Sequence, residues 1–232
     1  MMNTSRQELL TLIDGIIADE QLACNKKDTV WNFSSNTAKS IVHRIFKGDL
    51  RRSQEPTLTH IFTVSGMDAK GEFIHFMSEE ERIIRLFHDL FEDTELEISD
   101  GETWGMKTDT LIKIDILTRG EDDLYFDYIV TLGHDPLCVD IKLDDIQDNL
   151  DLSENLTLIR DVEKTQRKMI ANNYLKAVKM DKIPPGYSPI SFVDDHYDKG
   201  EQKTAHQIVE KYFTCPPANA TAPSKTISCV LN

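Results

Sequence analysis

The sequence predicts an all-α protein, and three observations favour this fold class. Helical patterns cover most of the chain, nonpolar residues form a stripe at helical spacing in the first segment, and a capping box begins the central one. With 232 residues and 40% hydrophobic content, the chain can fill the core of one globular domain with extensions. The predicted helices span residues 5–23, 34–46, 78–92, 107–117, 122–133, 136–150, 154–179 and 200–213.

The first helix and a proline-rich segment set the predicted domain limits. The nonpolar stripe in helix 5–23 is more typical of a core-facing helix than of an interface. It consists of Leu9, Leu10, Leu12, Ile13, Ile16 and Ile17. Segment 183–189 contains three prolines and one glycine, which interrupt the helical pattern. We therefore predict an N-terminal helical extension at 1–33, a central domain at 34–182, a C-terminal extension with a helix at 183–214 and a flexible tail at 215–232.

The helix predicted at 78–92 ends in a dense group of polar side chains. Ser78 and Glu81 form its capping box. The polar group consists of His88, Asp89, Glu92 and Asp93. Carboxylates are unfavourable at the negative end of a helix dipole, so a solvated helix end explains them poorly. In a continuous helix the first and third of them share one face, and the second and fourth share the adjacent face. A His-Asp doublet can offer a nitrogen and an oxygen to one divalent cation.

Two further residues complete a candidate ligand set with His88 and Asp89. His60 follows a polar stretch that contains a proline, and Asp145 lies in the predicted helix 136–150. Two histidines and two aspartates form a nitrogen and oxygen donor set that suits manganese, iron or zinc. Such a set leaves positions for water and substrate. We therefore predict a divalent metal site.

The helix face that carries Asp145 also carries a cation and an amide. Lys142, Asp145 and Asn149 follow the spacing i, i+3 and i+7, which places them on one side of the helix. We expect Asp144 and Asp148 to point away from the metal into solvent.

Three neighbouring patterns have simpler interpretations. Asp135 precedes Pro136 and is expected to cap the helix that begins there. Tyr125 and Tyr128 are predicted to be core or groove residues on helix 122–133. Helix 154–179 carries a basic group that we interpret as a solvated face, with a position near the substrate as the alternative. This group consists of Arg160, Lys164, Arg167 and Lys168.

Three ordered segments resemble the motifs of one protein family. The first is a basic pair and a Glu-Pro dipeptide that lead to His60. The second reads His-Asp-x-x-Glu-Asp-Thr from His88 to Thr94, and the third reads Lys-Leu-x-Asp-x-x-x-Asn-Leu from Lys142 to Leu150. Over residues 34–180, these segments are similar to the hydrolase domain of the RelA/SpoT family. They are closer still to the small single-domain HD phosphohydrolases related to it.

The resemblance implies an HD-domain helical bundle and a role for each motif residue. The implied ligands of the metal, which is commonly manganese in this family, are His60, His88, Asp89 and Asp145. Glu92 and Asp93 would orient and deprotonate the attacking water. The expected substrate contacts are Arg51, Arg52, Lys142 and Asn149. By family analogy Arg51 stacks on a guanine base, Arg52 meets phosphate, and Asn149 touches the ribose or phosphate.

Two departures from the family pattern fall on substrate recognition. Residues 46–49 read Phe-Lys-Gly-Asp in place of His-x-Gly-Gln, and Ile146 stands where the long enzymes have arginine. Guanosine tetraphosphate or pentaphosphate, losing its 3′-pyrophosphate, is the leading expected substrate. NADPH or a nucleoside 3′-phosphate is the alternative. A catalytically silent nucleotide-binding protein targeted to host membranes is a different class, which the presence of both Glu92 and Asp93 disfavours.

Composition limits partners and compartment. The formal charge of −14 makes general affinity for nucleic acid unfavourable, so an anionic substrate needs cations placed locally. The four cysteines are scattered without CxxC spacing, which fits a reducing compartment. No transmembrane run or secretory leader is evident in the sequence. We therefore expect a cytoplasmic protein.

The last four residues form a separate pattern. Cys229 is followed by Val230, Leu231 and Asn232, which has the shape of a prenylation box, although asparagine is outside the usual set for the last position. Chance in a frayed terminus is one interpretation. Prenylation is the other, and it would place the chain in a host-cell cytosol or on a membrane face. One lipid without a polybasic patch would bind a membrane weakly.

Overall fold

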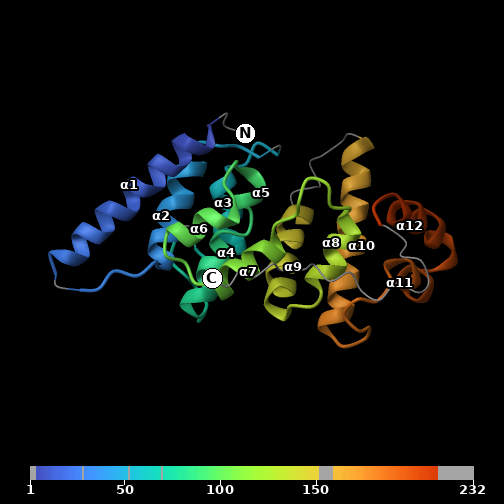
Figure 1. The fold of residues 1–232 in the computed structure, drawn as a ribbon. Helices are drawn as coiled ribbons and strands as arrows, with labels where there is room; N and C mark the ends of the chain where they lie inside the picture. Colours follow the sequence, from blue (N-terminus) through green and yellow to red (C-terminus); the bar gives the residue numbers. More distant parts are fainter. Residues whose placement is uncertain (1–3, 28, 52, 69, 152–158, 214–232) are drawn as a thin grey trace.

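The computed structural model describes residues 4–27, 29–51, 53–68, 70–151 and 159–213. Helices dominate this part of the chain and no β-strand occurs in it, so the predicted all-α class is confirmed (Figure 1). In chain order the helices are α1 (Arg6–Asn25), α2 (Ser35–Phe46), α3 (Thr57–Val64), α4 (Glu79–Leu86), α5 (Leu90–Asp93), α6 (Ile98–Thr103), α7 (Thr108–Leu117), α8 (Tyr125–Leu132), α9 (Pro136–Asp151), α10 (Ile159–Lys179), α11 (Pro189–His196) and α12 (Lys199–Lys211).

Three short helices, α3, α6 and α11, were not predicted. Each has eight residues or fewer, which is too short to give a clear periodic pattern. α11 also begins at Pro189, inside a segment interpreted as helix-breaking. Proline fits the first turn of a helix because its missing N–H has no helical partner there, and the Ser188 side chain caps this helix. A proline cluster can therefore end one helix and begin the next.

The predicted helix 78–92 is interrupted by a turn at residues 87–89, so the prediction of one continuous helix was wrong. Its start was predicted correctly, because the Ser78 hydroxyl accepts a hydrogen bond from the Glu81 N–H at 3.1 Å. At its end, the Arg85 carbonyl accepts a hydrogen bond from Nδ1 of His88 at 2.8 Å. A side chain that takes a helical carbonyl competes with the backbone ladder, which favours termination at this point.

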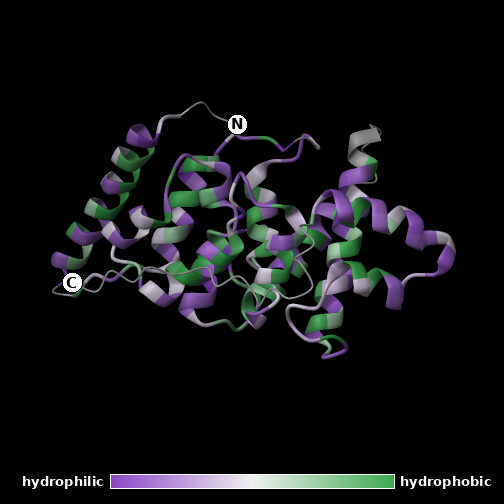
Figure 2. Ribbon diagram, turned by 45° about the vertical axis from the view of Figure 1, so that its right-hand side comes forward, coloured by the Kyte–Doolittle hydropathy of each residue, from purple (hydrophilic) through white to green (hydrophobic). Residues whose placement is uncertain are grey.

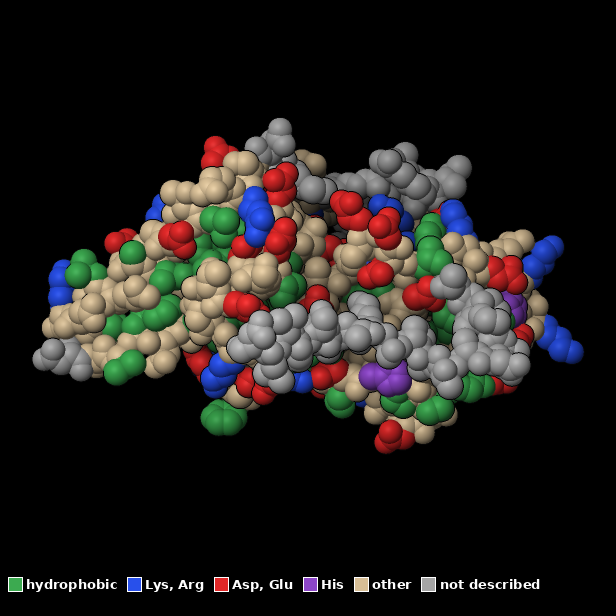
Figure 3. Space-filling view, viewed as in Figure 1, with side chains coloured by type: hydrophobic (Ala, Val, Ile, Leu, Met, Phe, Trp, Pro, Cys, Tyr) green, Lys and Arg blue, Asp and Glu red, His purple; other side chains and the backbone are tan. Residues whose placement is uncertain are grey.

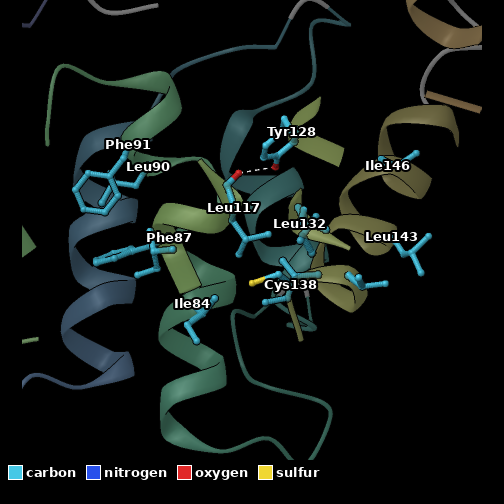
Figure 4. Packing of buried hydrophobic residues seen from close by; sticks show 14 of the residues in the cluster. Ile84, Phe87, Leu90, Phe91, Leu117, Tyr128, Leu132, Cys138, Leu143 and Ile146 are labelled. Atoms are coloured by element: carbon cyan, nitrogen blue, oxygen red, sulfur yellow. Dashed lines mark hydrogen bonds between the residues drawn. The ribbon is translucent and has the colours of Figure 1, made fainter. Parts of the chain in front are cut away.

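The hydrophobic core lies directly beneath this turn. Phe87, Leu90 and Phe91 are buried, and the Phe87 ring meets the Trp104 ring edge-on with centroids 6.5 Å apart. Figure 4 shows the three residues at one end of a cluster that continues to Cys138 at the start of α9. The turn is therefore anchored by its apolar side chains, which fixes the polar residues between them.

The first and the last described helices lie on opposite sides of the central helices. α1 is at one end of the molecule, and α11 and α12 are at the other (Figure 1). Leu9, Ile13 and Ile17 of α1 are buried and the rest of its stripe is partly buried, which confirms the core interpretation. Figure 2 shows hydrophobic residues concentrated in the central helices. Within the described part of the chain, no helix is both long and apolar enough to cross a bilayer.

Candidate metal centre

Three separate parts of the fold bring the predicted ligands together. His60 comes from α3, His88 and Asp89 come from the turn between α4 and α5, and Asp145 comes from α9. α3 packs against both α4 and α9, so it joins the three parts. His60, His88 and Asp145 are buried, and Asp89 is the most exposed of the four. The predicted cluster is therefore assembled by tertiary packing.

The distances within the cluster match those expected around one ion. Nε2 of His60 lies 3.3 Å from Nε2 of His88, 3.1 Å from Oδ2 of Asp89 and 3.3 Å from Oδ1 of Asp145. Nε2 of His88 lies 3.2 Å from the same Asp89 oxygen. Donor atoms bonded to one ion at about 2.0–2.2 Å would lie roughly 3.0–3.4 Å apart. The four residues can hold a divalent metal.

Hydrogen bonds fix the orientation of both imidazoles. Because a carbonyl can only accept, Nδ1 of His88 donates its proton to the Arg85 carbonyl, and its Nε2 is the nitrogen that faces the cluster. Nδ1 of His60 lies 2.6 Å from Oδ2 of Asp148, so Nε2 of this ring also faces the cluster. Such partners hold metal-binding histidines in place and increase their basicity.

Asp148 corrects one prediction from the sequence. It was expected to be solvated, but its side chain is only 17% exposed and contacts His60 and Arg51. Burial alone would raise the pKa of Asp148, yet hydrogen bonds and charges from His60 and Arg51 hold it below the ordinary aspartate value. Asp144 is exposed as expected and pairs with Arg85 at 2.7 Å. The spacing within α9 did not show that α3 covers one of these two carboxylates.

The predicted shared face of α9 is confirmed. Nζ of Lys142 lies 2.7 Å from Oδ2 of Asp145, and Nδ2 of Asn149 lies 2.6 Å from its other oxygen. Burial would raise the pKa of Asp145, but the positive charges of Lys142 and His60 hold it far below its ordinary value. Asp145 is therefore ionised and oriented before any ligand arrives.

His60 carries a proton when no metal is bound. Burial by itself would lower its pKa, but three carboxylates surround it and raise the pKa of His60 to about 11. They belong to Asp145, Asp148 and Asp89. A cation that binds through Nε2 would take the place of this proton, because a metal ligand must be the neutral imidazole.

The two carboxylates predicted to activate water lie beside the cluster. Glu92 and Asp93 both line the cavity that contains the metal ligands. Burial and the negative charges of Asp89 and Glu92 raise the pKa of Asp93 to about 7. Oε1 of Glu92 lies 3.7 Å from Nη2 of Arg119. A carboxylate with a pKa near neutrality can both accept and release a proton at physiological pH.

The cavity has a volume of about 280 Å³ and is lined by both cationic and acidic side chains. Aromatic side chains form another part of its lining, which confirms that Tyr125 and Tyr128 are groove or core residues. The cationic lining residues are Arg51, Arg119, Lys142, Arg167 and Lys168. The cavity therefore combines three of the four cluster residues, an acid pair and five cations.

The basic face of α10 was partly misinterpreted. It was expected to be solvated, but Arg167 and Lys168 line the cavity, as in the alternative interpretation. Burial lowers the pKa of Lys168 to about 8, although Asp145 nearby opposes the shift. Among the described residues, no carboxylate lies within ion-pair distance of Lys168. Arg119 was not predicted at all, because nothing in its local sequence signals the cavity.

Arg51, a predicted substrate contact, is bonded to two residues of α9. Its guanidinium bonds to Oδ2 of Asp148 at 3.0 Å and to Oδ1 of Asn149 at 2.7 Å, so this side chain is tied to α9 at the cavity wall. It is not an ordinary solvated loop residue. Arg52 and Cys229 lie outside the described residues.

Comparison with known proteins adds no identification. The chain matches no protein-family model, and no curated protein matches it significantly. The motifs and the cavity geometry are thus the basis for any functional assignment.

Proposed function

We propose that this chain is a metal-dependent nucleotide phosphohydrolase of the HD type. The observation that carries the proposal is a single cavity lined by three residues of the candidate metal cluster, by the acid pair Glu92 and Asp93 and by five cations. Each part serves phosphate ester hydrolysis, which needs an activated water and neutralisation of charge on the phosphoryl oxygens. The preferred substrate in this proposal is guanosine tetraphosphate or pentaphosphate, with release of the 3′-pyrophosphate.

The residues divide into three roles. His60, His88, Asp89 and Asp145 would hold the cation, for which manganese is our preferred choice because the donors are borderline nitrogens and hard oxygens. A divalent cation here would make bound water more acidic and polarise a phosphoryl oxygen. Glu92 and Asp93 lie where they can accept the proton of that water.

The five cations that line the cavity explain how a protein with a negative net charge could attract an anionic substrate to this site. The molecular face in Figure 3 displays many acidic side chains, in keeping with the charge of −14. Such a surface repels a polyanion in general, whereas five cations line the cavity around the candidate metal cluster. The Lys142 side chain is only 13% exposed and Lys168 is half-buried, so solvent screens their charges weakly. This distribution favours a small phosphorylated substrate over a nucleic acid.

Two features of the cavity favour a second substrate class as the alternative. Ile146 lines the cavity at the position where the long family members have arginine, so one expected cation is absent. Arg51 is engaged by Asp148 and Asn149 and must leave these partners in order to stack on a base. NADPH or a nucleoside 3′-phosphate is therefore the alternative substrate. A silent nucleotide-binding protein would have no need of the Glu92 and Asp93 pair.

Product release from a nucleotide panel tests the proposal. The panel contains guanosine tetraphosphate, nucleoside 3′-phosphates and NADPH, each with added manganese and with a chelator. Manganese-dependent pyrophosphate release from the tetraphosphate supports the preferred substrate, and release of one phosphate from another compound changes the substrate but keeps the mechanism. No turnover across the panel by the manganese-bound protein contradicts the hydrolase assignment.

Matched variants separate metal binding from chemistry. Replacing His88 or Asp145 with alanine should abolish both manganese binding and turnover. Glu92→Gln or Asp93→Asn should leave manganese bound and slow turnover by at least about a hundredfold. Asp144→Asn is the control, because Asp144 lies on α9 next to Asp145 but is exposed and outside the cavity. Full activity of either carboxylate variant would show that its proposed role in water activation is wrong.

A further inference from the structure

Arg167, at the cavity wall, lies between two aromatic rings. Its guanidinium carbon is 4.1 Å from the centre of the Tyr125 ring and 4.7 Å from the centre of the Tyr212 ring. Tyr125 is the first residue of α8, whereas Tyr212 directly follows α12 in the C-terminal extension. A cation over an aromatic face is attracted by the ring quadrupole, and rings on two sides leave mainly the N–H edge of the guanidinium for a ligand.

Three polar contacts that Tyr212 and its neighbour Lys211 make with other helices hold Tyr212 in place. Its hydroxyl donates to Oε1 of Glu163 at 2.5 Å, and Lys211 bonds to the same oxygen at 2.6 Å. Its carbonyl accepts a hydrogen bond from the Phe126 N–H at 2.8 Å. That N–H belongs to the first turn of α8, where amides lack helical partners. The end of the C-terminal extension is thus fastened to the helix that supplies Tyr125.

Arg167 has unused hydrogen-bonding capacity. Its Nε is buried without a hydrogen-bond partner, and the buried hydroxyl of Tyr125 also lacks one. Among the described residues, no carboxylate lies within ion-pair distance of Arg167. A buried donor without a partner is costly, so a ligand that accepts hydrogen bonds would relieve this cost. The cavity that Arg167 lines is where such a ligand would sit.

We infer that Tyr212 is a positioning residue for substrate binding. It does not line the cavity, but it clamps Arg167 against Tyr125 so that the guanidinium edge faces an anionic group of the ligand. The inference rests on the proposed function to the extent that this group is a phosphate. It also makes the C-terminal extension part of the substrate site, although its helices contribute no metal ligand.

Inorganic phosphate is the probe for this inference, with binding measured by calorimetry on the full-length chain. Tyr212→Leu, which removes the ring, should weaken phosphate binding about tenfold, and Arg167→Gln should weaken it at least as much. Tyr212→Phe keeps the ring and should bind phosphate within about twofold of wild type. Lys203→Ala is the matched control, since it removes an exposed positive charge from the same helix, α12, and leaves the ring stack intact. Manganese affinity should not change in any of these variants.

A double-mutant comparison distinguishes positioning from a general structural effect. In the Arg167→Gln background, Tyr212→Leu should cause no further loss of phosphate affinity, because the cation that it positions is gone. If Tyr212→Leu does not fold, 3,4,5-trifluorophenylalanine at position 212 keeps the ring shape but weakens its negative face. It should bind phosphate less tightly than Tyr212→Phe. Equal affinities in that pair, or equal losses in both backgrounds, would overturn the inference.

Failure of the inference can be told apart from failure of the proposed function. Wild-type protein that binds phosphate through Arg167 but turns over no nucleotide would refute the hydrolase and leave the positioning role intact. Turnover with normal kcat and KM in Tyr212→Leu would refute the positioning role and leave the hydrolase intact. Wild-type protein that does not bind phosphate at all would refute the role assigned to Arg167 and Tyr212.

Discussion

Manganese binding should release a proton from His60. The imidazole has a pKa of about 11 in the metal-free protein, because the carboxylates of Asp145, Asp148 and Asp89 outweigh the effect of burial. It is therefore protonated throughout the neutral range. The cation and the proton compete for the same nitrogen, so raising the pH favours the cation.

The size of the pH effect on manganese affinity follows from this competition between proton and cation. Below the pKa of His60, one proton leaves for each ion bound, and the apparent association constant rises about tenfold per pH unit. Between about pH 6.5 and about pH 8.5 the affinity should rise roughly a hundredfold, which corresponds to about 2.7 kcal/mol. Asp93 adds a smaller contribution below its pKa of about 7, since a nearby cation would also lower that pKa.

Calorimetry in two buffers with different ionisation enthalpies counts the protons directly. Near pH 7.5 the wild-type protein should release about one proton per manganese ion. Asp93→Asn is the control variant, because it removes the second titrating group and should leave one proton at every pH. An affinity that is constant over this range, with no proton released, would show that His60 is not a ligand or is neutral without metal.

Three further expectations concern the cavity wall and the scaffold. The charge of Lys168 is lost as the pH rises through its pKa of about 8. Phosphate affinity should therefore fall above about pH 8 in wild type but not in Lys168→Arg. If phosphate affinity changed with pH in the same way in both proteins, this expectation would be contradicted. The Asp135 side chain caps α9 by accepting a hydrogen bond from the Cys138 N–H. Asp135→Ala should therefore lower the free energy of unfolding in urea by about 1 kcal/mol, and Asp135→Asn by less. Equal losses of unfolding free energy in the two variants would contradict the cap. Burial would raise the pKa of Asp100, but Arg6 and a backbone N–H hold this pKa below the ordinary aspartate value. The contribution of ionised Asp100 to folding stability is therefore present at neutral pH and is lost as the pH falls below about 4. The stability difference between wild type and Asp100→Asn should therefore shrink from pH 7 to pH 3, and a constant difference would refute that assignment.

The sequence was informative where local spacing alone decides the outcome. The stripe of α1, the cap at Asp135 and the shared face of Lys142, Asp145 and Asn149 each depend on residues within a few turns of one helix. The ligand cluster was predicted from residue types and family resemblance. Its assembly from α3, α9 and a turn could not be derived from periodicity.

Contacts between distant segments account for what was missed. Asp148 was misplaced because the sequence does not show that α3 packs over that part of α9. Arg167 and Lys168 have the spacing of an ordinary charged helix face, and only the packing of α10 against α9 turns them toward the cavity. Tyr212 lies 45 residues after Arg167, and no local pattern connects the two.

The break between α4 and α5 sets the geometry of the candidate metal site. In a continuous helix, consecutive side chains diverge by about 100°, which would place His88 and Asp89 on adjacent faces. The turn instead brings Nε2 of His88 to 3.2 Å from Oδ2 of Asp89. It also changes how the acidic residues should be interpreted. Glu92 and Asp93 belong to α5, a separate helix of only four residues, so their charges do not lie at the negative end of the longer helix α4. The dense acidic ending that indicated a functional site was therefore also a signal of where the helix stops.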